Sequence, residues 1–255
     1  MTITAIRPRT DGEAAVLVRI ALFVTWASMP LLAIVADVFG LVPMGTSAII
    51  VVPLSVMLLV LMKVAPHPSD AIIRHGFIVG MVACVPYDVF RLSAVHLGHL
   101  MGDFIPKLGL FIMGDSGAVG ATVGYLWRYL GDAAGAAVGF YVVAFVVGLH
   151  RWPRPGRVVL AATAFAVFPV WTGLISLVAL APRGEELMFE LTPATVAITL
   201  IGHMIFGFVL GLGFVRARHL GAYWPWPPLS LTALRRDAAP ADVHQLTKPR
   251  LAEAA

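Results

Sequence analysis

Long apolar runs, separated by short polar segments, follow one another along most of the chain. Each run approaches the roughly 20 residues that a helix needs to cross a hydrocarbon core about 30 Å thick. The apolar residues are continuous rather than alternating, which favours helices over the strands of a membrane barrel. The pattern predicts an all-α protein, a polytopic transmembrane helix bundle with six spans. We place these spans at residues 15–38, 47–63, 72–97, 133–149, 158–181 and 194–215.

The segment at 98–132 is apolar but ambiguous, because LGLFIMGDSGAVGATVGYLWRYL could form a seventh span. Basic residues decide between the alternatives, since short loops rich in arginine and lysine stay on the cytoplasmic side. With six spans, Lys63, the basic loop HRWPRPGR at 150–157 and both termini all lie on that side. We therefore predict cytoplasmic termini, and a re-entrant or interfacial segment between spans three and four.

Composition agrees with a membrane protein. Hydrophobic residues make up 59% of the 255 residues and charged residues only 13%, so little chain remains for a folded soluble domain. We predict a cytoplasmic N-terminal segment at 1–14, the bundle at 15–217 and a largely disordered cytoplasmic tail at 218–255. The net charge is +4, but the basic residues gather at the ends of apolar runs. This distribution indicates contact with a lipid bilayer and argues against nucleic acid as a partner.

Glycines recur four residues apart within three of the predicted spans. Residues at that spacing share one face of a helix, and small side chains there let a neighbouring helix approach closely. We therefore predict that spans three, four and six form the tightly packed centre of the bundle. The glycines concerned are Gly76, Gly80, Gly131, Gly135, Gly139, Gly207 and Gly211.

The stretch YDVFRLSAVHLGHLMGD at 87–103 concentrates ionisable residues in an apolar chain. On one continuous helix these residues would fall within an arc of roughly 140°. An unshielded charge near the bilayer centre costs at least ~2.5 kcal/mol, so we predict that this stripe faces the bundle rather than lipid. The residues of the stripe are Asp88, Arg91, His96, His99 and Asp103.

Asp88 and Arg91 lie three residues apart, deep in the third span, and are predicted to form an ion pair. One interpretation is a structural pair that neutralises itself and fixes helix packing. The other is a relay for protons or ions, because intramembrane charges are costly and are retained for function. The sequence leaves both interpretations open.

His96, His99 and Asp103, with His203 from span six, are candidate ligands of a divalent metal ion. Imidazole nitrogen and carboxylate oxygen suit zinc and similar metals. The alternative is that the first three are interfacial residues without a ligand and that His203 is a hydrogen-bonded core histidine. Further polar candidates on the outer side are Asp115, Arg128 and Asp132. No phosphate-binding loop or dinucleotide fingerprint occurs, so we expect no reaction driven by ATP or NAD.

Three short pieces of the chain resemble a loosely defined group of small bacterial inner-membrane proteins without an assigned function. They are VPYDVFRL at 85–92, GYLWRYLGDAAGAAVG at 124–139 and GHMIFGFVLGLGF at 202–214. In that group the second piece more often carries an aromatic–His–aromatic triplet followed by Asn-Gly, and here Arg128 and Asp132 occupy that neighbourhood. The resemblance implies a multi-pass protein of the bacterial inner membrane and brings no activity with it.

These patterns favour a non-enzymatic function. The chain would handle a proton, a metal ion or a small amphiphile, as a small transporter or an accessory subunit, through a polar centre open to the outer face. One alternative is a membrane-embedded enzyme in which the histidines and Asp103 hold a metal ion and its bound water. Another is a structural subunit that docks on other membrane proteins or on a second copy through its glycine-rich faces.

Overall fold

The computed structural model describes residues 11–227, and within that range the chain folds into helices without any strand. Six helical segments are long and apolar enough to cross a membrane, which confirms the predicted six-span bundle. Four spans are single helices: α1 (Asp11–Val38), α2 (Met44–Val64), α3 (Asp70–His96) and α10 (Pro193–Arg216). The predicted segments at 1–14 and 218–255 lie mostly outside the described residues.

Spans four and five each contain a π-helical segment between two α-helices. Span four joins α5 (Ala118–Leu126), η1 (Trp127–Ala133) and α6 (Ala134–Val146). Span five joins α7 (Pro155–Phe165), η3 (Ala166–Trp171) and α8 (Thr172–Leu180). In η3 the wider turn surrounds Pro169, which has no backbone N–H to donate and so cannot complete a regular α-helix. Such wider turns often occur at functional sites.

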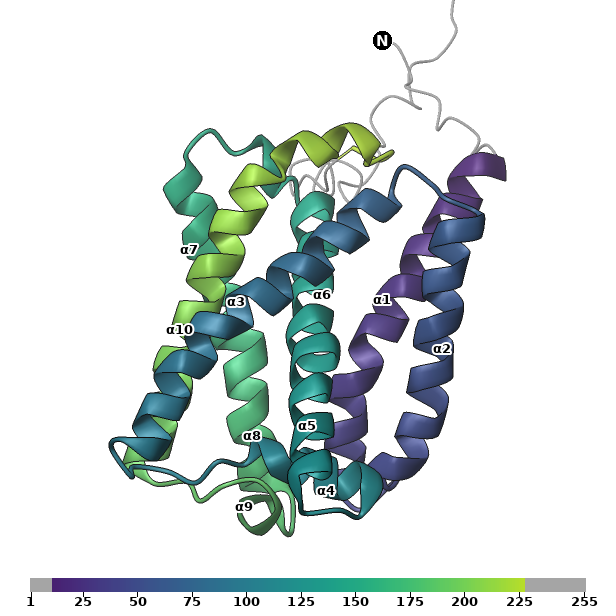
Figure 1. Ribbon diagram of the computed structural model, residues 1–255. Coiled ribbons are helices and arrows are strands. Elements are labelled where there is room, and N and C mark those ends of the chain that lie inside the picture. Colours follow the sequence, from purple (N-terminus) through teal and green to yellow (C-terminus); the bar gives the residue numbers. More distant parts are fainter. Residues whose placement is uncertain (1–10, 228–255) are drawn as a thin grey trace, which may run out of the picture.

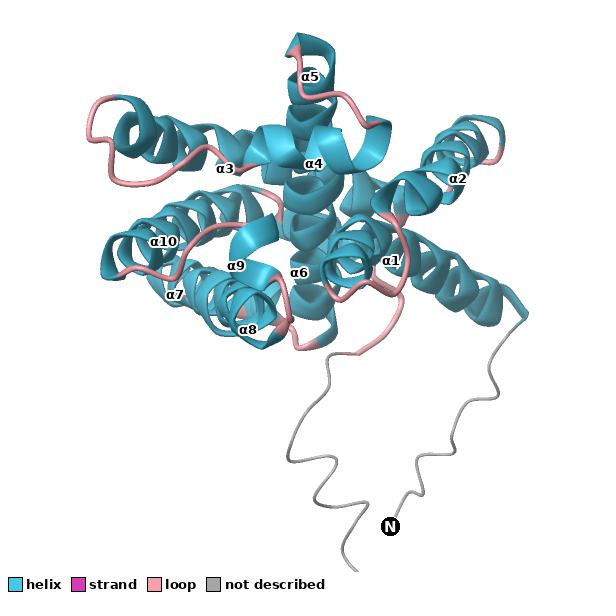
Figure 2. Ribbon diagram, turned by 90° about the horizontal axis from the view of Figure 1, so that it is seen from below, coloured by secondary structure: helices cyan, strands magenta, loops and turns pink. Residues whose placement is uncertain are grey.

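Three short helices lie between spans and a fourth follows span six. They are α4 (Ile105–Met113), η2 (Leu149–Arg151), α9 (Gly184–Leu187) and η4 (Arg218–Tyr223). Figure 1 shows the start of α1 and the end of α10 at the same end of the bundle, with α4 and α9 at the opposite end. Seen from that opposite end, α4 lies across the bundle rather than along it (Figure 2).

Span four lies in the middle of the bundle, with α1 and α2 on one side and α3, α7, α8 and α10 on the other (Figure 2). Gly76 of α3 lies so close to span four that a Cβ there would be 3.1 Å from the Cα of Val138. Gly211 of α10 is similarly close to Val159 of span five, at 2.7 Å. Close packing at glycines is therefore found in both helices, but Gly211 lies against span five, which the prediction did not place in the centre. Gly139 differs, because nothing lies within 4 Å of a Cβ placed there.

The outward surface of the bundle is strongly apolar, as contact with a lipid bilayer requires. Along α2 the exposed side chains include Ile49 at 75% and Ile50 at 57% of their full accessibility.

Polar contacts join α1 to α3 and to α2. The Arg19 guanidinium donates two hydrogen bonds of 2.7 Å to Asp70, and Trp26 Nε1 donates one to Ser55.

The prediction that all of 98–132 lies outside the spans is wrong for its second half. Span four begins at Ala118, so Arg128 and Asp132 lie inside the bundle and only residues 97–117 stay at its end. The sequence analysis placed these two charged residues outside because the bias of basic loops favoured six spans, and span four was then taken to begin at residue 133. In the structure Arg128 is paired with Asp88 of α3, which offsets the cost of a charge inside the membrane.

The two ends of the bundle differ in charge. The end that holds the first residues of α1 and the last of α10 is basic, with Lys63, Arg74, Arg151, Arg154, Arg157, Arg216 and Arg218. The opposite end is mainly acidic. Its charged residues are Asp37, Asp103, Lys107, Asp115, Arg183, Glu185, Glu186 and Glu190.

Candidate functional site

The predicted ion pair of span three is present and is part of a larger network. Arg91 Nε lies 3.1 Å from Asp88 Oδ1, and both side chains are almost fully buried. Arg128 of η1 brings its own Nε to 3.3 Å from the same oxygen. The Cys84 thiol donates to the other oxygen of Asp88 over 3.6 Å. One carboxylate of α3 therefore joins two arginines from two helices.

The same network reaches the chain that precedes α4. Arg91 Nη1 donates to Asp103 Oδ1 over 2.7 Å, and the Tyr125 hydroxyl donates to Asp103 Oδ2 over 2.7 Å. Arg91 Nη2 also donates to the Tyr125 oxygen over 3.1 Å. Burial raises the pKa of Asp103, but the hydrogen bonds from Tyr125 and Arg91 outweigh burial and hold this pKa below its ordinary value.

The charges of this network balance, because the two arginines face the two carboxylates of Asp88 and Asp103. Arg91 uses all three of its donor nitrogens on partners in α3, the 97–104 segment and α5. Removing one partner from a buried pair costs about 3–5 kcal/mol, because it leaves the other charge uncompensated. This arrangement fits the structural interpretation of the Asp88–Arg91 pair, in which the network fixes how three segments pack.

The predicted stripe is not one continuous helix. The helix α3 ends at His96, and His99 adopts a left-handed backbone conformation with φ of 49°. Asp103 still meets Arg91, but it does so because the chain folds back after Gly98. His96 and His99 lie at the exposed end of the bundle.

The candidate metal ligands are not brought together. Within residues 11–227, no group of three or more histidine, cysteine, aspartate and glutamate side chains lies close enough to hold one metal ion. His96 and His99 are exposed, Asp103 is bound to Arg91, and His203 lies in α10 beside Tyr87. Asp115 is also elsewhere, where it accepts hydrogen bonds from Gly117 and Gly120 at the start of α5. The divalent-metal site stays a prediction.

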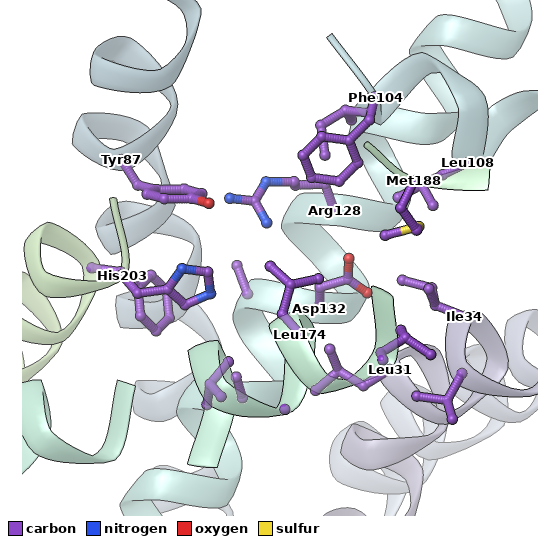
Figure 3. Close-up of a pocket in the computed structure, with 18 of the residues that line it drawn as sticks. Leu31, Ile34, Tyr87, Phe104, Leu108, Arg128, Asp132, Leu174, Met188 and His203 are labelled. Carbon is purple, nitrogen blue, oxygen red and sulfur yellow. The ribbon is translucent and has the colours of Figure 1, made fainter. Parts of the chain in front are cut away.

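A cavity of about 310 Å³ lies beside the network, among the helices of the bundle (Figure 3). One wall comes from α1 and the facing wall from span five. The apolar residues of these two walls are Leu31, Ile34, Val35, Pro169, Val170, Gly173, Leu174 and Leu177. Toward the acidic end the cavity is closed by Phe104, Ile105, Leu108 and Met188. The cavity is therefore built from segments that are far apart in the sequence.

Four residues with polar side chains line this cavity: Tyr87, Arg128, Asp132 and His203. The Arg128 guanidinium lies over the ring of Tyr87, 4.5 Å from its centroid. His203 packs edge-on against the same ring, and its Nδ1 donates to the carbonyl oxygen of Thr199 over 2.7 Å. A carbonyl oxygen only accepts, so a neutral His203 keeps Nε2 as an acceptor.

Asp132 differs from the other acidic residues of the spans because it lacks a partner. Its Oδ1 atom is buried without a hydrogen bond, and no ion pair in the described part of the chain includes this residue. Leaving a buried polar group unsatisfied costs about 1–3 kcal/mol, and more for a charged one. In Figure 3 its carboxyl group points toward Ile34 and Leu31 of α1, whereas the Arg128 guanidinium points toward Tyr87.

The polar end of the cavity is far from both membrane surfaces. At about 1.5 Å per residue, Asp132 lies about 21 Å along span four from Ala118, and Arg128 about 15 Å. His203 lies about 15 Å along α10 from Pro193 by the same reckoning. An unpartnered carboxyl group at this depth lies where water is scarce.

The chain has no counterpart among the proteins compared with it: no family model matches, and no curated protein or solved structure shows significant similarity. The resemblance to small bacterial inner-membrane proteins stays a prediction.

Proposed function

We propose that this chain is an integral membrane protein that binds a small amphiphile within the bilayer and exchanges it with the outer side of the membrane. The observation that carries the proposal is the cavity, which is apolar along two facing walls and polar at Arg128, Asp132 and His203. An amphiphile has the same division, with an apolar body and a polar head. The cavity volume of about 310 Å³ falls at the lower end of the roughly 300–1,000 Å³ typical of ligand pockets.

The same observation favours an amphiphile over a proton or a metal ion as the ligand. A path for protons or ions needs a continuous series of polar groups, whereas most of the residues that line this cavity are apolar. The polar residues that do come together, Asp88, Arg91, Asp103 and Arg128, neutralise one another. We therefore assign the network to packing and the cavity to binding.

A route to the outer side is supported by a second hollow at the acidic end of the bundle. This groove is lined by Asp103, Lys107, Glu186 and Thr192 among others, and it shares Phe104 and Met188 with the cavity. These two side chains separate the cavity from the groove. Lys107 fixes this barrier, because its Nζ donates to the carbonyl oxygens of Glu186 at 3.1 Å and of Met188 at 3.3 Å.

The orientation that we propose follows the charge of the two ends. Basic loops remain on the cytoplasmic side, so the basic end faces the cytoplasm and the acidic end faces outward. Both termini then lie in the cytoplasm, and the membrane that we propose is the inner membrane of a bacterium. The cavity opens toward the outer face when Phe104 and Met188 move apart.

The test of this function fills the cavity with a side chain. Gly173 lies among the cavity-lining residues of span five, and nothing is within 4 Å of a Cβ placed there. Gly173→Leu should therefore fold normally and occupy the cavity. Gly139→Leu is the matched control, because Gly139 also has open space around its Cβ but lies away from the cavity.

Binding is measured with three radiolabelled amphiphiles of the same chain length: decylamine, decanol and decanoate. Each variant is placed in nanodiscs of zwitterionic lipid, and binding to empty nanodiscs is subtracted. We expect saturable binding of at least one amphiphile to the wild type and to Gly139→Leu, and its loss in Gly173→Leu. Equal binding to both variants, or no saturable binding to the wild type, would contradict the proposed function.

A further inference from the structure

We propose that the occupant of the cavity is a cationic amphiphile whose protonated amine binds the carboxylate of Asp132. This inference rests on the proposed function and adds the chemical class of the ligand. It follows from three observations: the balance of charges around the cavity, the lack of a partner for Asp132, and the directions in which the polar side chains point.

The charges around the cavity leave one carboxylate without a counterion. Arg91 and Arg128 together balance Asp88 and Asp103. Asp132 is the third carboxylate of this region, and no arginine, lysine or histidine of the described chain pairs with it. A ligand with one positive charge therefore makes the region neutral, whereas an anionic ligand would add to an excess of negative charge.

The hydrogen bonds lead to the same conclusion. An ionised carboxylate only accepts hydrogen bonds, and the buried Oδ1 of Asp132 receives none. A ligand that carries a donor can satisfy this oxygen. A primary ammonium group carries three N–H donors and a full positive charge, so it satisfies the carboxylate better than a hydroxyl group.

Arg128 carries the positive charge that could repel such a ligand, but its guanidinium is directed toward Tyr87 and not toward Asp132. Arg128 donates to Asp88 through Nε and stacks over Tyr87, and its guanidinium points away from the Asp132 carboxyl (Figure 3). The side chains toward which Asp132 points are Ile34 and Leu31. An amine at Asp132 therefore continues into an alkyl chain that contacts α1 and the facing wall of span five.

The size of the cavity sets the length of the alkyl chain. Liquid water takes roughly 30 Å³ per molecule, so about 310 Å³ holds on the order of ten atoms other than hydrogen. Decylamine is of about this size and is protonated at neutral pH, because aliphatic amines titrate near pH 10.4, as lysine does. Decanol and decanoate keep the alkyl chain and change only the head group.

The experiment compares the three amphiphiles on the wild type, on Asp132→Asn and on Asp115→Asn, in the nanodisc assay described above. Asp115→Asn makes the same chemical change at the start of α5, outside the cavity. Asparagine also accepts hydrogen bonds at the start of a helix, so this variant should fold normally. We expect the wild type to bind decylamine more tightly than decanol and decanoate. Asp132→Asn should weaken decylamine binding by at least about 30-fold, as the loss of a buried charge partner does, and should change decanol binding by less than about threefold.

Two results would overturn the inference. One is that the wild type binds decanol or decanoate as tightly as decylamine, or more tightly. This measurement uses only the wild type, so it decides the question even if Asp132→Asn fails to fold. The other is undiminished decylamine binding by a folded Asp132→Asn. If none of the three amphiphiles binds to the wild type, the proposed function itself fails, and this outcome is distinct from binding of the wrong head group.

Discussion

The most demanding test of the network is the replacement of Arg91 by glutamine. Arg91 is fully buried and donates to Asp88, Asp103 and Tyr125. Glutamine is shorter and uncharged, so it leaves Asp103 with only Tyr125 as a side-chain partner. We expect Arg91→Gln to lower the free energy of unfolding by about 3–5 kcal/mol, the cost of removing one partner from a buried ion pair.

The assay is reversible unfolding in mixed micelles, followed by circular dichroism. Arg183→Gln serves as the control, because it removes an arginine from the ion pair with Glu186, in which both side chains are 63% exposed. Exposed pairs contribute little, so this variant should unfold almost as the wild type does. If Arg91→Gln were as stable as Arg183→Gln, the network would not hold the helices together.

The pH dependence gives an independent check on the same network. The folded pKa of Asp103 lies below its ordinary value, so folding gains stability from this carboxylate above the unfolded pKa of about 3.9. That stability is lost as the pH falls through the folded pKa. Between about pH 6 and about pH 3, the wild type should therefore lose more stability than Arg91→Gln. Equal losses in the two proteins would refute the role of Arg91 at Asp103.

Two further substitutions test the packing and the outer barrier. Gly80→Ala should lower the free energy of unfolding by about 1–3 kcal/mol, because its Cβ would lie 2.7 Å from Ala137 Cβ, whereas Gly139→Ala should not. Thermal melts of both variants decide this, and equal melting temperatures would contradict it. Lys107→Met should speed dissociation of a bound amphiphile about tenfold in a chase experiment, by removing a charged donor worth about 1.5 kcal/mol. If the dissociation rate equalled that of an Arg183→Met control, Lys107 would have no role in the barrier.

Hydropathy and charge bias were sufficient to predict the class of fold and the number of spans, because both depend on the bilayer rather than on contacts between helices. They misplaced the start of span four. A hydropathy profile treats Arg128 and Asp132 as charged residues that are unfavourable in a span. Only the fold shows that Asp88 neutralises Arg128. The position of a span that carries charge is set by its partners, which the local sequence does not contain.

The candidate site was predicted only in part, for a similar reason. The spacing of Asp88 and Arg91 on one helix was enough to predict their pairing, whereas the return of Asp103 depends on a turn after the helix has ended. No single stretch of the sequence indicates the cavity, because its walls come from α1, span five and η1. Taken alone, each of these segments resembles an ordinary apolar span. Its polar residues were candidates, but their role follows from the space between the helices.

The central claim is that an amphiphile occupies the cavity between α1 and span five. Photolabelling tests it most directly, with a decylamine analogue that carries a diazirine at the end of its alkyl chain. In nanodiscs, we expect labelled peptides from residues 31–35 and 169–177, with labelling abolished by excess decylamine. Labelling confined to the lipid-facing side of α2, or labelling that excess decylamine leaves unchanged, would contradict the claim.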